Sequence, residues 1–219
     1  MKFYINKYHF FKPQNDAEVP DISFVPAMQR RKMSQLIKMT VAIAHNITES
    51  DKQVAAVYSS RYGEWEQTLK QLLKYFEEHE VSPTGFGLSV HNAAIGMVSL
   101  LNKNQKSYTS IAGNEHTFDS GLIESIATLN KEDKVLYISS NERTPELYRG
   151  TFPENIRPLC IGITISKNQN SIEDIPFEIT FTGTPSTYSS DYKHILDFMH
   201  FIENKNTIFH GHNYTLKKL

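Results

Sequence analysis

The chain has 219 residues, of which 39% are hydrophobic and 21% are charged, a composition typical of a globular protein and not of a disordered one. A formal net charge of -1 at pH 7 gives no general positive field, so nucleic-acid binding is not expected. The single cysteine, Cys160, excludes an internal disulfide and a thiol-rich metal site. No apolar run approaches the roughly 20 residues of a membrane span, and the N-terminus has no signal-peptide pattern, so we expect a cytoplasmic chain without stable membrane insertion.

The first two thirds of the sequence predict alternating strands and helices. In chain order we expect a strand at residues 3–11, a helix at 30–47, a strand at 54–59, helices at 64–79 and 92–101, a strand at 107–112, a helix at 118–129 and a strand at 134–140. The helix at 64–79 carries apolar residues at the spacing of a core-facing surface: Trp65, Leu69, Leu72, Leu73 and Phe76. Before the next helix, Pro83, Gly85 and Gly87 are expected to interrupt regular structure.

The last third continues the pattern after an irregular passage. We expect strands at 159–166 and 177–182, a helix that ends at Glu203 and begins at Ser189, Ser190 or Asp191, and a last strand at 207–216. The whole order predicts an α/β fold in which helices cover a mixed, at least partly parallel, central sheet. We expect one domain spanning residues 1–219.

Three phrases occur in a fixed order: Arg-Arg-Lys-Met-Ser at 30–34, Ser-Ser-Arg-Tyr-Gly-Glu at 59–64, and Ser-Pro-Thr-Gly-Phe-Gly-Leu-Ser-Val-His-Asn-Ala-Ala at 82–94. With them the sequence resembles the ketosynthase-like N-terminal domain of short chain length factors, including those of aryl polyene pathways. The resemblance covers about residues 24–140, and residues 141–219 form a C-terminal extension of the same domain. It implies a thiolase-like (ketosynthase-like) half fold that lacks most of the second half, where two catalytic histidines of a complete ketosynthase lie.

The resemblance also places a nucleophile elbow at Asn114, Glu115 and His116, between the expected strand at 107–112 and the helix that follows. Condensing chemistry needs a thiol at such an elbow, where the helix N-terminus favours the thiolate. Neither Asn114 nor Glu115 can hold a thioester, and the sequence leaves open which of the two occupies the nucleophile position. Cys160 lies in an apolar strand pattern and is expected to be a buried core residue. We therefore expect a degenerate elbow, no catalytic residue, no metal and no cofactor.

A ketosynthase-like subunit without its own nucleophilic thiol needs a catalytic partner. The resemblance implies a heterodimer with a full-length ketosynthase, in which this chain helps to set acyl or polyene chain length and meets an acyl carrier protein through the complex. The strand at 107–112 would lie at the interface. The candidate interface or acyl-tunnel residues are Phe86, Leu88, His91, Asn92, Met97, Leu101, Ser107, Tyr108, Thr109, Ser110, Ile111 and Ala112. For the apolar ones, ordinary core packing is an open alternative, and His91 and Asn92 could instead cap a helix.

Other interpretations of the polar residues stay open. Glu115, His116 and Asp119 could serve an independent acyltransferase or hydrolase, and the chain could be a homodimeric acyl-binding protein. His210 and His212 would share one face of a strand and could help to bind zinc, or could simply belong to a terminal strand. The basic run at 30–32 could be a solvated helix start or a contact for an acidic carrier protein.

Overall fold

The computed structural model describes the chain except for residues 49–50, 152–155, 184–189 and 205. Within the described residues, one eight-stranded sheet forms the centre of the molecule, in the order β3-β2-β4-β5-β1-β6-β8-β7. The strands are β1 (Lys2–Phe11), β2 (Ala55–Ser59), β3 (Tyr108–Ile111), β4 (Lys134–Asn141), β5 (Leu159–Ser166), β6 (Ile175–Phe181), β7 (Ile208–His210) and β8 (Tyr214–Lys218). Strand β2 pairs parallel with β3 and β4, and the other pairs are antiparallel, so the predicted mixed sheet is confirmed.

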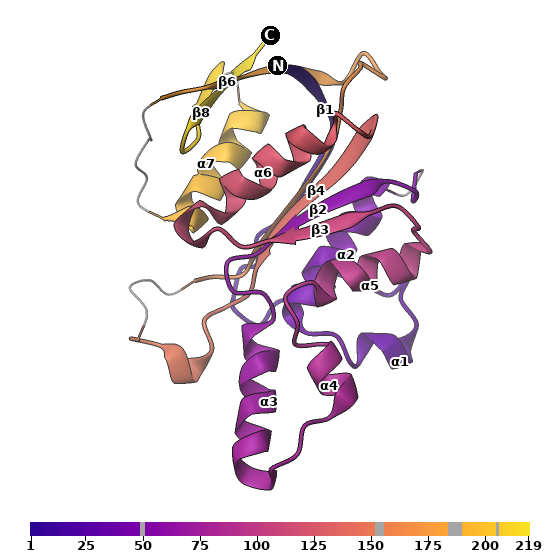
Figure 1. Ribbon diagram of the computed structural model, residues 1–219, viewed down its shortest axis with the longest axis vertical. Coiled ribbons are helices and arrows are strands. Elements are labelled where there is room, and N and C mark those ends of the chain that lie inside the picture. The colour runs from indigo at the N-terminus through magenta and orange to yellow at the C-terminus, as the bar shows by residue number, and fades with distance from the viewer. Residues whose placement is uncertain (49–50, 152–155, 184–189, 205) are drawn as a thin grey trace.

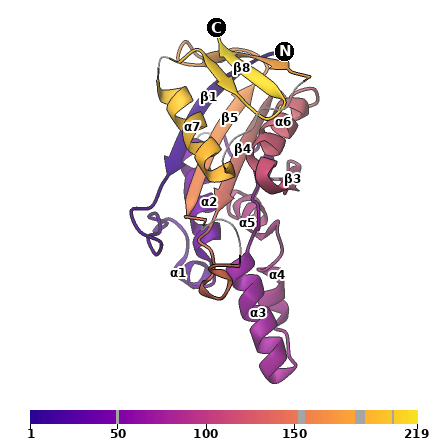
Figure 2. The same ribbon diagram turned by 90° about the vertical axis from the view of Figure 1, so that its left-hand side faces the viewer.

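Helices cover both faces of this sheet (Figures 1 and 2). They are α1 (Ala27–Arg30), α2 (Gln35–Thr48), α3 (Trp65–Glu78), α4 (Pro83–Gly87), α5 (Ala93–Asn102), α6 (Thr117–Thr128) and α7 (Asp191–Glu203), with short 3-10 turns η1 (Asn114–His116) and η2 (Glu146–Tyr148). Helices α2 and α5 bury one apolar core against the sheet, and α6 and α7 bury a second one on the opposite face. No helix in the described part of the chain is long and apolar enough to cross a membrane.

The helix expected at 30–47 starts later than predicted, as α2 (Gln35–Thr48), and a separate short helix, α1 (Ala27–Arg30), precedes it. Helix α1 ends at Arg30, and α2 begins only at Gln35. Ser34 lies between them, and its Oγ accepts the Ile37 backbone N–H at 3.0 Å, which satisfies one of the free donors at the start of α2. The hydrophobic period continues across this cap, so periodicity alone did not reveal it.

Helices α3 and α4 form a hairpin that projects from the sheet (Figure 1). The expected α3 helix is present, but the prediction that its apolar face packs on the core is wrong, because Trp65 is its one buried residue. Leu72 and Leu73 are each 45% exposed and Phe76 is 73% exposed. The segment expected to be irregular contains α4, which Ser82 caps by accepting the Gly85 N–H. This hairpin therefore presents an apolar surface that nothing in the described chain covers.

The last strand, expected to run over residues 207–216, is a hairpin of β7 and β8. The turn closes at Gly211, whose N–H donates to the Tyr214 carbonyl at 2.9 Å. A Cβ on Gly211 would lie 2.1 Å from the Tyr214 ring, so the close approach of these two residues requires glycine. Ser190 caps α7 by accepting the Lys193 N–H, while Ser189 lies outside the described residues.

Candidate functional site

The turn from β3 into α6 has the geometry of a strained strand-to-helix elbow. Asn114 has a φ of 53°, in the left-handed region that a non-glycine residue seldom adopts. Thr117 holds the turn, because its hydroxyl accepts the Gly113 N–H at 2.9 Å and donates to the Asn114 carbonyl at 2.7 Å. A strained turn at Asn114 thus links β3 to α6 and carries an amide side chain.

Arg61, from the loop after β2, faces this elbow. Its guanidinium donates to the Asn114 side-chain carbonyl at 3.2 Å and pairs with the Glu115 carboxylate at 3.4 Å. The Arg61 side chain is only 9% exposed, whereas that of Glu115 is 55% exposed. Sequence reasoning placed Arg61 in a turn and gave it no site role, although it belongs to one of the three matching phrases. Its contacts tie the side chain of the elbow residue to the loop after β2.

Behind the elbow, the buried Asp119 carboxylate joins α6 to the C-terminal elements. It accepts hydrogen bonds from the Tyr214 hydroxyl at 2.6 Å and from the His212 backbone N–H at 3.0 Å, and it lies 3.0 Å from His194 Nε2. Asp119 is 1% exposed and His194 is 3% exposed. A substrate outside the protein does not reach this pair, so the arrangement favours a structural role for Asp119 over the acid–base role considered above.

The histidines 210 and 212 do not share a strand face, so that expectation is wrong. His210 ends β7, whereas His212 lies in the turn before β8 and stacks on His116 with 3.6 Å between the ring centroids. Partial burial and the neighbouring His212 lower the pKa of His116. No group of three or more histidine, cysteine, aspartate or glutamate side chains is placed to hold a metal ion in the described ranges.

Cys160 is fully buried on β5, as its apolar context predicts. Burial raises the pKa of its thiol to about 12, because the low-dielectric interior disfavours the thiolate. A thiol of this kind is neither ionised nor reachable at neutral pH. Cys160 is therefore not placed to act as a nucleophile.

The candidate tunnel residues lie on α4, on α5 and between them. Phe86, on α4, is 60% exposed. Leu88, Met97 and Leu101 are half-buried against the core under α2 and α5. These three residues contact the core and keep part of their surface accessible.

The histidine and asparagine that precede α5 behave differently from each other. His91 Nε2 lies 2.7 Å from the Ser60 carbonyl, a contact that holds the loop after β2 against the start of α5. Asn92 occupies the N-cap position of α5, is exposed, and makes no side-chain capping bond. The capping interpretation is therefore wrong for the Asn92 side chain.

The strand expected at 107–112 is β3, which forms one edge of the sheet. Its side chains are exposed or half-buried, and Tyr108 is 40% exposed. Ser107, Thr109 and Ala112 are exposed, whereas Ser110 and Ile111 are half-buried. An exposed edge strand offers unpaired backbone groups to another chain. The elbow and this edge are thus neighbours along the chain.

The chain matches a family model and several solved structures. The model of the beta-ketoacyl synthase N-terminal domain matches residues 6–215. A chain in the structure of the ketosynthase ApeO in complex with its chain length factor ApeC, from Xenorhabdus doucetiae, is similar with a TM-score of 0.81 and 18% identity, over 100% of this chain and 99% of that one. No curated protein matches the sequence.

Two further structures show the same fold over part of their length. The ishigamide ketosynthase/chain length factor matches with a TM-score of 0.56 and 14% identity, over 69% of this chain and 50% of that one. A type II polyketide ketosynthase complex with its acyl carrier protein, AntDE:AntF, matches with a TM-score of 0.58 and 12% identity. The match covers 83% of this chain and 61% of that one. These likenesses establish the thiolase-like ketosynthase fold, and the family match shows that this chain belongs to the beta-ketoacyl synthase N-terminal domain family.

Proposed function

We propose that this chain is a non-catalytic, chain-length-factor-like subunit that forms a heterodimer with a full-length ketosynthase. The observation that carries the proposal is an intact elbow that presents an amide in place of a thiol. The left-handed φ falls on Asn114 and not on Glu115, which supports Asn114 as the counterpart of the nucleophile. A condensing enzyme cannot form its acyl thioester on an amide.

The proposed interface consists of the β3 edge and the α3–α4 hairpin. The hairpin has exposed large apolar residues along its length: Leu72, Leu73, Tyr75, Phe76, Val81 and Phe86. Exposed large apolar side chains gathered on one hairpin are typical of an interaction site. A partner that adds to β3 and covers the hairpin would satisfy both features at once.

The acyl carrier protein would reach this subunit at the basic surface around α1. Arg30, Arg31, Lys32 and Lys38 form no ion pair with any described residue. Arg30, Arg31 and Lys38 border a hollow of about 470 Å³ whose other walls include apolar side chains. Cations around an apolar hollow suit an acidic protein surface, and such binding weakens as salt rises.

Condensation assays separate this function from an independent enzyme. We expect the purified chain to form no condensation, transfer or hydrolysis product from acyl carrier substrates, and the complex with a ketosynthase to form elongated product. Asn114→Ala in this chain would leave the rate of the complex within a few-fold, whereas removal of the partner's active-site thiol would abolish it. Turnover by the isolated chain that is lost in His116→Ala would contradict the proposal.

A further inference from the structure

Two buried carboxyl groups lie at the root of α3. Glu64 directly precedes α3 and is 1% exposed, and Glu142 directly follows β4 and is 3% exposed. Glu64 Oε1 accepts the Ser34 hydroxyl at 2.9 Å, while its Oε2 is buried without a hydrogen-bond partner among the described residues. Glu142 Oε1 accepts the Glu66 backbone N–H at 3.0 Å, in the first turn of α3.

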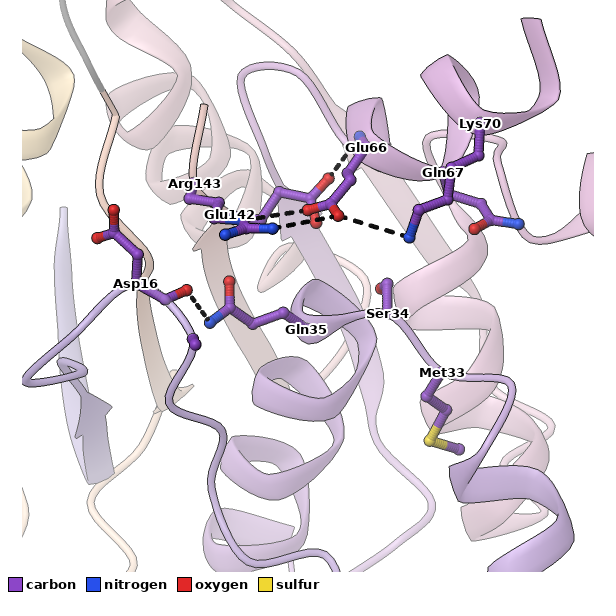
Figure 3. Close-up of a pocket in the computed structure, with 10 residues that line it drawn as sticks. Asp16, Met33, Ser34, Gln35, Glu66, Gln67, Lys70, Glu142 and Arg143 are labelled. Carbon is purple, nitrogen blue, oxygen red and sulfur yellow. Dashed lines mark hydrogen bonds and ion pairs between the residues drawn. The ribbon is translucent and has the colours of Figure 1, made fainter. Parts of the chain in front are cut away.

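The nearby cationic side chains form ion pairs with a third carboxylate and not with Glu64 or Glu142. Arg143 and Lys70 both pair with the Glu66 carboxylate, at 3.4 Å and 3.5 Å (Figure 3). Neither Glu64 nor Glu142 therefore has a direct ion-pair partner in the described chain. Burial raises the pKa of Glu64 to about 7 and that of Glu142 to about 8, and the repulsion between the two carboxylates adds to the shift of Glu142.

Several titratable or charged groups from the surrounding elements act on this carboxyl pair. They are Tyr58 on β2, Glu66 and Lys70 on α3, and Arg143 after β4, with Asp16 on the far wall of the adjoining cavity. The cavity has a volume of about 270 Å³, and Ser34, Glu66 and Glu142 line it (Figure 3). The Glu142 carboxyl borders this cavity, through which solvent would exchange its proton.

Helix α3 is fastened to the body at its first turn. Trp65 is the one buried residue of α3, and its Nε1–H donates to the Arg143 carbonyl at 2.8 Å. The Glu66 N–H to Glu142 bond and the Glu66 pair with Arg143 complete the attachment to the segment after β4. Farther along, the helix has exposed or half-buried side chains, and Figure 2 shows α3 extending away from the sheet. A change in this first turn would therefore be transmitted to the whole hairpin.

We propose that Glu64 and Glu142 form a proton-dependent latch that fixes the α3–α4 hairpin to the body. While the pair holds a proton, the first turn of α3 stays docked on residues 142 and 143. When both carboxyls ionise, their repulsion and their need for water separate α3 from that segment, and the hairpin loosens. The proposal concerns the isolated chain and does not depend on the heterodimer.

Trp65 is the only tryptophan in the sequence, so intrinsic fluorescence reports directly on the latch. The full chain is titrated from about pH 5.5 to pH 9.5, and we expect the emission to shift to longer wavelength with a midpoint between pH 7 and pH 8. Glu142→Gln and the double variant with Glu64→Gln mimic the protonated state and should lose this transition. Glu78→Gln, at the exposed end of the same helix, should keep it.

Hydrogen exchange of wild-type chain at pH 6.5 and pH 8.5 keeps the proposal testable if the glutamine variants fail to fold. After correction for intrinsic exchange rates, we expect the amide exchange rate to be at least tenfold higher at pH 8.5 than at pH 6.5, and only in residues 66–88. A uniform change in exchange rate across the chain, or no change, would overturn the latch proposal. So would a fluorescence transition that survives in the double variant, which would point to another titrating group. Failure to bind a ketosynthase would contradict the proposed function and leave these results unaffected.

Discussion

The Tyr214 hydroxyl donates to Asp119 Oδ1 at 2.6 Å, and this bond joins the last strand of the sheet to the helix that follows the elbow. Tyr214 is fully buried and Asp119 is 1% exposed. The same carboxylate meets His194 on α7 and the backbone of His212. One buried acid thus connects α6 to three parts of the C-terminal segment, and the elbow depends on residues about 100 positions away.

Tyr214→Phe tests this connection. Removing the hydroxyl takes one donor from a buried carboxylate, so we expect the free energy of unfolding to fall by about 1–3 kcal/mol. Chemical denaturation followed by circular dichroism measures the change. Tyr75→Phe, on the exposed part of α3, is the matched control and should change stability by less than about 0.5 kcal/mol. Equal stability of Tyr214→Phe and wild type would rule out the structural role of this bond.

The exposed hairpin can be tested with Phe76→Ser. Because Phe76 is 73% exposed, the substitution should leave the melting temperature of the isolated chain nearly unchanged and increase its solubility. It should weaken binding to a ketosynthase by at least tenfold, measured by titration calorimetry. Ile172→Ser, at a residue that is 95% exposed between β5 and β6, is the control and should leave binding intact. Similar ketosynthase affinities for both variants would show that the hairpin is not part of the interface.

Stability should depend on pH through Glu64 and Glu142. Their folded-state pKa values of about 7 and about 8 lie above the ordinary value of 4.5, so the folded state binds these protons more tightly than the unfolded state does. Their contribution to the free energy of unfolding is complete below about pH 4.5 and is lost as the pH rises through 7 and 8. Between pH 5 and pH 9 we expect wild type to lose on the order of 6 kcal/mol relative to the Glu64→Gln/Glu142→Gln variant, measured by denaturant unfolding. A constant difference between the two proteins would contradict this linkage.

Product length should respond to side-chain size at Phe86 and Met97. In the assembled pair, Phe86→Ala would remove bulk from the proposed acyl path and lengthen the product, while Met97→Trp would shorten it. Mass spectrometry of the products measures both effects. Ile172→Ala, outside the hairpin and 95% exposed between β5 and β6, serves as the control. An identical product distribution across the series would leave these residues with packing roles alone.

Sequence patterns predicted the strands well because β2, β4 and β5 are nearly continuous apolar runs and are buried on both faces. The same reasoning failed at α3. An amphipathic pattern predicts that one face avoids water, but it does not say whether that face meets the chain's own core or another molecule. The strong periodicity at Leu69, Leu72 and Phe76 was therefore real, and only its assignment to the core was wrong.

In the candidate site, too, some features could be predicted from the sequence and others could not. The resemblance to chain length factors placed the elbow between the strand at 107–112 and the helix that follows. The burial of Glu64 and Glu142 left no local signal, because those residues meet only when the loop after β2 and the segment after β4 come together. The Asp119 contacts likewise depend on the β7–β8 hairpin, where Gly211 and Asn213 gave a turn signal that was read as part of one strand.

The native mass of this chain, expressed alone and together with a full-length ketosynthase, tests the central claim most directly. We predict a stoichiometric heterodimer on co-expression, because a ketosynthase would cover the apolar hairpin and the β3 edge, and a lower solubility of the chain when it is expressed alone. A stable monomer or homodimer that ignores the ketosynthase would contradict the account and favour an independent acyl-binding protein.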